Sequence, residues 1–84
     1  MSFRVTAGGV ARALGWSRAD LRRSRRRDWV AWQRFDAGQG IGKRQLYDSR
    51  LIEVLRGIRG EPTRGLVPED RDWLTAYLKG RADA

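Results

Sequence analysis

Six of the ten residues from 18 to 27 are arginine, and this segment holds most of the chemistry that the sequence offers. A guanidinium group is always charged at neutral pH, and its planar set of donors matches phosphate oxygens and guanine edges. On a helix these cations repel one another unless a polyanion lies beside them. The segment therefore predicts a surface that binds a polyanion, with nucleic acid as the first candidate.

The expected roles of the cations differ with their position along this segment. Arg18 and Arg22 lie one helical turn apart on the leading face, and we expect them to bind base edges. Ser17, just before them, could donate to a phosphate or a base. Asp20 could accept from a cytosine amino group, but its place favours stabilising the helix start or pairing with an arginine. The remaining arginines are expected to contact phosphates, which position a protein without reading sequence: Arg23, Arg25, Arg26 and Arg27.

Charge is distributed unevenly along the chain. The 84 residues carry a formal net charge of +8, and residues 1–34 hold nine arginines against two acids, whereas residues 61–84 hold four basic and five acidic side chains. A GC-rich coding bias would explain why arginine outnumbers lysine, but it would not explain why the charge is clustered. A clustered basic face is typical of a protein that binds a polyanion.

The composition excludes several classes of function. The chain has no cysteine and no histidine, which removes disulfides, thiolate chemistry, the usual zinc sites and histidine acid–base catalysis. No nucleotide-binding or other cofactor motif is present. We therefore expect no enzymatic activity, no cofactor and no metal. No signal-peptide pattern or long apolar window predicts a membrane segment, so a cytoplasmic, nucleoid-associated protein is expected.

Two helices are expected to position the arginines. Thr6 predicts the start of a helix over residues 7–14, Gly15 predicts its end, and Ser17 predicts the cap of a second helix over 18–27. This spacing is typical of a helix-turn-helix. An ordinary helical hairpin with a solvated face would share the same turn. The expected small contact residue and the apolar anchors are Ala11, Val10, Leu14, Trp16 and Leu21.

Beyond the arginine segment, aromatic and β-branched residues predict a strand over 29–35, and 44–47 predicts its partner. The glycine-rich residues 36–43 between them predict a wing, from which Lys43 and Arg44 would reach the DNA backbone or minor groove. A hairpin loop with no contact is the alternative. Trp29 and Trp32 could stack on bases, but closing a small core is the favoured interpretation.

The C-terminal part of the chain predicts two more helices. Asp48 is expected to cap a helix that ends near Ile58, and Pro68 to begin the last helix, with a polar turn over residues 59–67. The expected fold class is mainly α with a small β-hairpin (α+β), a winged helix-turn-helix in the order helix-helix-strand-wing-strand-helix-helix. Residues 1–60 are expected to form the DNA-binding domain, and residues 61–84 to pack on it or on a partner.

The stretches VARALGWSRADLRR and GIGKRQLYDSRLIEVL resemble winged-helix proteins of the MerR and phage excisionase type, and also the N-terminal domain of Mu-type phage transposases. The resemblance covers about residues 5–58. It implies that Ser17, Arg18, Arg22 and Arg23 enter the major groove and that Lys43 and Arg44 lie on the wing. The chain departs from MerR proteins in lacking a long C-terminal coiled coil, which puts their mode of dimerisation and effector sensing in doubt.

Together these patterns predict sequence-specific binding of double-stranded DNA, by a transcription regulator or a recombination and excision factor of phage type. A homodimer on DNA is left open, as is a protein partner for the last helix, whose apolar stripe is Trp73, Leu74, Tyr77 and Leu78. Two alternatives remain. One is a protein-interaction module, such as a small phage inhibitor of a host enzyme, and the other is an RNA-binding protein that uses Trp29, Trp32 and Phe35.

Overall fold

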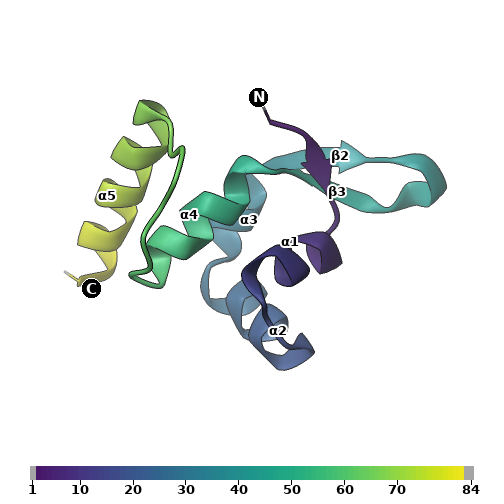
Figure 1. Cartoon of the computed structure of the whole chain (residues 1–84), viewed down its shortest axis with the longest axis horizontal. Helices are drawn as coiled ribbons and strands as arrows, with labels where there is room; N and C mark the ends of the chain where they lie inside the picture. Colours follow the sequence, from purple (N-terminus) through teal and green to yellow (C-terminus); the bar gives the residue numbers. More distant parts are fainter. Residues whose placement is uncertain (1, 83–84) are drawn as a thin grey trace. The chain divides into compact units, whose positions relative to one another are not determined.

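The computed structural model describes residues 2–82, and its backbone contacts divide the chain into two compact units. Unit 1 extends to Ile52, and unit 2 begins at Glu53. Helix α4, Arg50–Ile58, runs across this boundary. Each unit is described by itself below (Figure 1). The predicted domain boundary at residue 60 stays a prediction.

Unit 1 contains the two predicted helices with the expected caps. Helix α1 is Ala7–Leu14, and its first turn is capped by the Thr6 hydroxyl, which accepts from the Gly9 N–H at 3.1 Å. Gly15 ends α1 at a left-handed φ of 72°, and the Trp16 N–H then donates to the Ala11 carbonyl at 2.9 Å. This conformation favours glycine, because a Cβ crowds the backbone there. Helix α2 follows as Arg18–Arg27.

The predicted strand over residues 29–35 is wrong, because this segment forms helix α3, Trp29–Arg34. The buried positions are Asp28, Ala31, Trp32 and Phe35, whereas Trp29 and Val30 are exposed. That spacing of three, four and seven residues is the period of a helix and not the alternation of a strand. The strong β-propensity of tryptophan and valine suggested a strand, but the pattern of burial outweighs it.

A three-stranded antiparallel sheet completes unit 1, with strand order β1-β3-β2. Strand β1, Arg4–Val5, was not predicted and pairs with β3, Gln45–Asp48, so that Val5 lies opposite Tyr47. Strand β2, Asp36–Gln39, occupies half of the predicted loop. A 3₁₀ turn, Ile41–Lys43, joins β2 to β3, and the hairpin projects from the helices of the unit (Figure 1).

The core of unit 1 is formed by side chains from its helices and its sheet. Trp32 and Tyr47 meet edge to face, with ring centroids 4.9 Å apart. The guanidinium of Arg50 lies over the ring of Phe35 at 5.2 Å. The buried apolar residues of this unit are Val10, Ala11, Ala31, Trp32, Phe35, Tyr47 and Leu51. Trp32 and Phe35 are therefore core residues, as the favoured interpretation of the aromatic segment predicted for Trp32. The same prediction is wrong for Trp29, which is 52% exposed because it lies on the outward face of α3.

Unit 2 consists of the second part of α4, a turn and helix α5, Pro68–Ala82. Gly57 lets the Leu74 side chain lie directly against the α4 backbone, because a Cβ at position 57 would overlap the Leu74 Cδ2. Leu74 is accordingly buried. Trp73 and Tyr77, one turn apart on α5, stack with ring centroids 4.9 Å apart. The start of α4 is as predicted, since the Arg50 N–H donates to the Asp48 carboxylate at 2.9 Å.

The fold class is α+β, as predicted, but the sheet has three strands where a single hairpin was expected. Within residues 2–82, no helix combines the length and apolar composition needed to cross a bilayer. In the same described range, no group of acidic side chains is placed to hold a metal ion.

Candidate nucleic-acid interface

Helix α2 is held to unit 1 by a narrow face that contains one buried polar contact. Ser24 is only 2% exposed, and its hydroxyl accepts a hydrogen bond from the Trp32 indole N–H at 3.1 Å. Leu21, one turn earlier, is half-buried. A buried donor and acceptor that satisfy each other set the rotation of a helix, because a turn of the helix would leave both unpaired. All six arginines of α2 are therefore exposed.

Three of these arginines already interact with groups of this chain. Arg23 pairs with Asp20 at 2.6 Å, and Arg27 pairs with the buried Asp28 at 3.1 Å. Arg25 donates to the Tyr47 hydroxyl at 3.3 Å and lies 5.6 Å from the centre of the Trp32 ring. The Arg25 contacts join α2 to α3 and the sheet, whereas the Arg23–Asp20 pair lies within α2 and Asp28 lies at its C-terminal end. Part of the charge predicted to contact phosphates therefore also has a structural role.

The other three arginines form a continuous stripe, which we call the arginine stripe: Arg18, Arg22 and Arg26. In residues 2–82 no carboxylate lies within ion-pair distance of any of them. Their spacing of four residues places them on one side of α2, turning slowly around the helix. With Leu21 and Arg25 they line a shallow hollow along the helix surface. These three arginines of α2, which have no acidic partner among residues 2–82, thus lie side by side.

The N-terminus of α2 is closed by a reciprocal cap. The Ser17 hydroxyl accepts from the Asp20 N–H at 3.2 Å, and the Asp20 carboxylate accepts from the Ser17 N–H at 3.0 Å. The Ser17 backbone and hydroxyl, with Arg23, lower the pKa of Asp20 from its ordinary value. The favoured role of Asp20, at the helix start and beside an arginine, is confirmed. A DNA contact from Ser17 stays a prediction, since its hydroxyl also bonds Asp20 at 3.0 Å.

The hairpin presents the other two predicted cations. Lys43 and Arg44 are exposed at the turn between β2 and β3, and Lys43 has a left-handed φ of 61°. Ile41 lies at the same turn and is completely exposed. The structure therefore brings the predicted site residues together as two groups in unit 1, on α2 and at the hairpin turn.

A second hollow of unit 1 was not predicted. It is lined by aromatic and polar side chains from α2, α3 and the hairpin: Arg25, Trp29, Trp32, Gln33, Asp36, Gln45 and Tyr47. Trp29 is half-exposed, in contrast to the buried Trp32. The helical spacing of residues 28–35 could have indicated this difference, because it places Trp29 on the outward face of α3.

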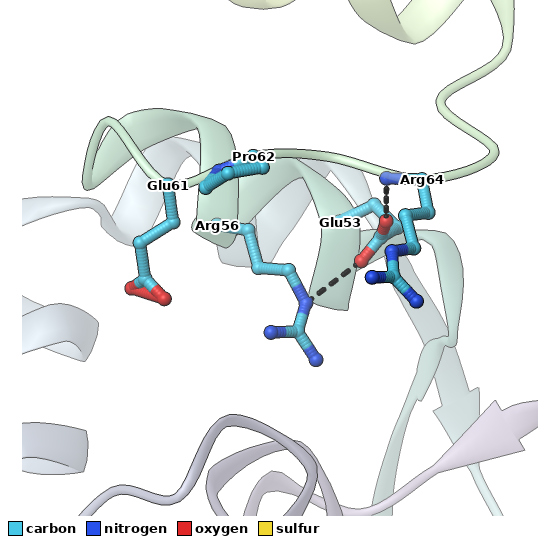
Figure 2. Close-up of a pocket in the computed structure, with 5 residues that line it drawn as sticks. All are labelled: Glu53, Arg56, Glu61, Pro62 and Arg64. Carbon is cyan, nitrogen blue, oxygen red and sulfur yellow. Dashed lines mark hydrogen bonds and ion pairs between the residues drawn. The ribbon is translucent and has the colours of Figure 1, made fainter.

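Unit 2 has a pocket of its own, shown in Figure 2. Glu53 accepts from the Arg56 side chain at 2.8 Å and from the Arg64 backbone N–H, while Arg59 pairs with Glu61 at 3.5 Å. Both carboxylates here are thus paired with an arginine. The pocket offers an anion less uncompensated charge than the arginine stripe does.

Comparisons with protein-family models, with curated proteins and with solved structures found no match to this chain. The resemblance to winged-helix proteins of the MerR, excisionase and Mu transposase types therefore stays a prediction from the sequence pattern. The functional argument depends on the side chains of α2 and the hairpin.

Proposed function

We propose that this protein binds double-stranded DNA in a sequence-specific manner, as a small winged-helix protein with α1 and α2 as the helix-turn-helix and the β2–β3 hairpin as the wing. The observation that carries the proposal is the arginine stripe. Three adjacent, exposed cations on a well-anchored helix have no acidic partner among residues 2–82, and a polyanion would neutralise them.

The dimensions of α2 fit this role. The N-terminal half of a recognition helix usually enters the major groove, so Arg18 and Arg22 would meet base edges. Arg26 lies about 12 Å further along the helix axis than Arg18, which is close to the groove width of about 12 Å. Arg26 would therefore reach the phosphates at the edge of the groove. The hydrogen bonds from Arg25 to Tyr47 and from Trp32 to Ser24 fix the rotation of α2 relative to α3 and β3.

A role in transcription or in recombination and excision would follow from such binding, and it belongs to the same proposal. The C-terminal helix α5, with its stacked Trp73 and Tyr77, is the proposed contact for a protein partner.

One observation favours a second candidate, the binding of single-stranded RNA. Trp29 is 52% exposed and lines a hollow together with Arg25 and Gln33. An exposed aromatic ring beside cationic and amide side chains can stack on an unpaired base. Duplex DNA remains the leading proposal, because the arginine stripe does not line this hollow and the arginine that does, Arg25, is partly engaged by Tyr47.

The test is a binding measurement on matched neighbouring variants. A selection on random duplexes identifies a site, and fluorescence anisotropy then measures affinity for that site, for a scrambled duplex and for single-stranded RNA. Arg22→Ala should weaken binding to the selected duplex by about tenfold to 100-fold, as expected when a bidentate base contact is lost. Arg23→Ala removes the same charge one residue away, but from an arginine already paired with Asp20, and should weaken binding less.

Two results would contradict the proposal. The first is a tighter complex with single-stranded RNA than with any selected duplex, which would support the second candidate. The second is an equal loss of affinity for Arg22→Ala and Arg23→Ala on all duplexes, which would indicate attraction by net charge alone.

A further inference from the structure

The turn of the hairpin presents an isoleucine fully to solvent. Ile41 has a relative exposure of 101%, whereas the next most exposed large apolar side chain of residues 2–82 is Phe3 at 65%. Burial of an isoleucine side chain away from water is favourable, and isoleucine is among the residue types most often found buried. Ile41 contributes to no core among the described residues, so its side chain is available to a partner outside the chain.

The backbone holds Ile41 in the turn that joins the two strands of the hairpin. The Gly40 N–H donates to the Arg44 carbonyl at 2.8 Å, and the Lys43 N–H donates to the Gly40 carbonyl at 3.1 Å. Gly42 follows Ile41 at a φ of 77°, which reverses the chain within a few residues. These bonds close the turn, so Ile41 lies within a hydrogen-bonded segment of backbone.

The turn is also fixed to the body of the hairpin. Gly40 lies so close to Leu46 that a Cβ at position 40 would overlap the Leu46 side chain. Leu46 is half-buried in strand β3. The contact between the glycine backbone and this leucine keeps the turn in line with the two strands.

Two exposed cations lie at the same turn as the isoleucine. Lys43 and Arg44 are exposed beside it, and neither has a carboxylate partner among the described residues. The acidic residue at the start of β2, Asp36, accepts hydrogen bonds from the Gly38 N–H and from the Gln45 side-chain amide. The hairpin thus ends in a single apolar side chain within a positively charged surround.

We propose that the hairpin enters the minor groove and inserts Ile41 between two base pairs, so that the duplex kinks. This rests on the proposed binding of duplex DNA and adds an architectural action to it. Proteins that bend DNA insert apolar side chains of this size from the minor groove, and the narrow groove attracts cations. Lys43 and Arg44 would lie against the phosphates on either side of the opened step.

A protein partner is a poorer match for the same feature. A stable protein interface buries about 800 Å² on each side and has a continuous apolar centre. One isoleucine flanked by two cations and three glycines provides neither. A base step fits the feature better, because partial unstacking exposes apolar base faces to one inserted side chain and the phosphates beside the step are anionic.

The test measures binding and bending on the same samples. A duplex of about 20 base pairs, with the selected site at its centre, carries a donor and an acceptor dye at its ends; it is far shorter than the persistence length of about 150 base pairs and is straight when free. Anisotropy reports binding, and energy transfer at saturating protein reports the distance between the ends. The wild-type protein should raise the transfer by an amount that corresponds to a kink of about 20–90°.

Ile41→Ser should bind with an affinity reduced by less than about tenfold and leave the transfer close to that of the free duplex, since wedge insertion trades unstacking against added contacts. Ile41→Leu should retain the bend. Val30→Ser, which removes an exposed aliphatic side chain from α3, is the matched control and should bend the duplex as the wild type does.

The outcomes separate the two proposals. Wild-type binding with unchanged energy transfer, or an Ile41→Ser protein that bends the duplex fully, would overturn the insertion of Ile41 and leave the binding of duplex DNA intact. A failure to bind any duplex in the anisotropy measurement would overturn both.

Discussion

The arginine stripe makes a quantitative prediction about salt. Each phosphate that a protein cation neutralises releases about one counterion, which contributes about −0.9 to the slope of log K against log salt concentration. Arg26 of the stripe and the two hairpin cations are the ones proposed to lie against phosphates, so they predict a slope of about −2.7 and a fall in affinity of about 40-fold between about 50 and about 200 mM salt. Replacing Arg18, Arg22 and Arg26 together by glutamine leaves two cations, a slope of about −1.8 and a fall of about 12-fold.

The assay is a titration of the selected duplex by anisotropy at four or more salt concentrations. The matched control replaces three exposed arginines of unit 2 by glutamine, which changes net charge equally: Arg59, Arg64 and Arg71. We expect the control to keep nearly the full slope. A stripe variant with the wild-type slope would refute the assignment of these cations to the interface. So would a control variant that loses as much slope as the stripe variant.

Two predictions concern the support of α2. Ser24→Ala should lower the free energy of unfolding by about 1–3 kcal/mol, because the buried Trp32 indole N–H loses its acceptor. Urea denaturation measures this free energy. An unchanged midpoint of unfolding would show that the contact does not stabilise the fold. Ser17 and Arg23 hold the pKa of Asp20 below its ordinary value of 3.8 in the folded protein, so its contribution to stability is complete above that pH and is lost as the pH falls below it. Asp20→Asn should therefore be less stable than the wild type at neutral pH, and the difference should shrink at about pH 2; a difference that stays constant would contradict the argument.

The elements that the sequence predicted correctly are those whose signals are local. Thr6, Gly15 and Ser17 cap or end helices through bonds to residues within five positions, so their types and spacing were sufficient. Helix α3 was predicted as a strand, because the β-propensity of tryptophan and valine in the segment after Asp28 is strong, whereas its helical spacing shows only in the pattern of burial. Strand β1 was missed because its two residues form a strand only by pairing with β3, more than 40 positions away.

The candidate site shows the same division. Composition identified the arginines and the hairpin cations, because charge density can be read directly from the sequence. Composition could not separate Arg22 from Arg25, since Arg25 is engaged by Tyr47, which lies 22 positions later in the chain. The exposure of Ile41 likewise depends on the turn that Gly40 and Arg44 close. Long-range contacts thus decide which of several similar residues are available to a ligand.

Strand β1 has a practical consequence for handling this protein. The Ser49 N–H donates to the Phe3 carbonyl at 2.7 Å, and the Phe3 N–H donates to the Ser49 hydroxyl at 3.0 Å. The residues just before β1 are therefore hydrogen-bonded to the residue that follows β3 of the hairpin. A bulky purification tag or a dye attached at residue 2 would lie next to these hydrogen bonds. Labels for the binding and bending measurements are therefore better placed on the nucleic acid or after α5.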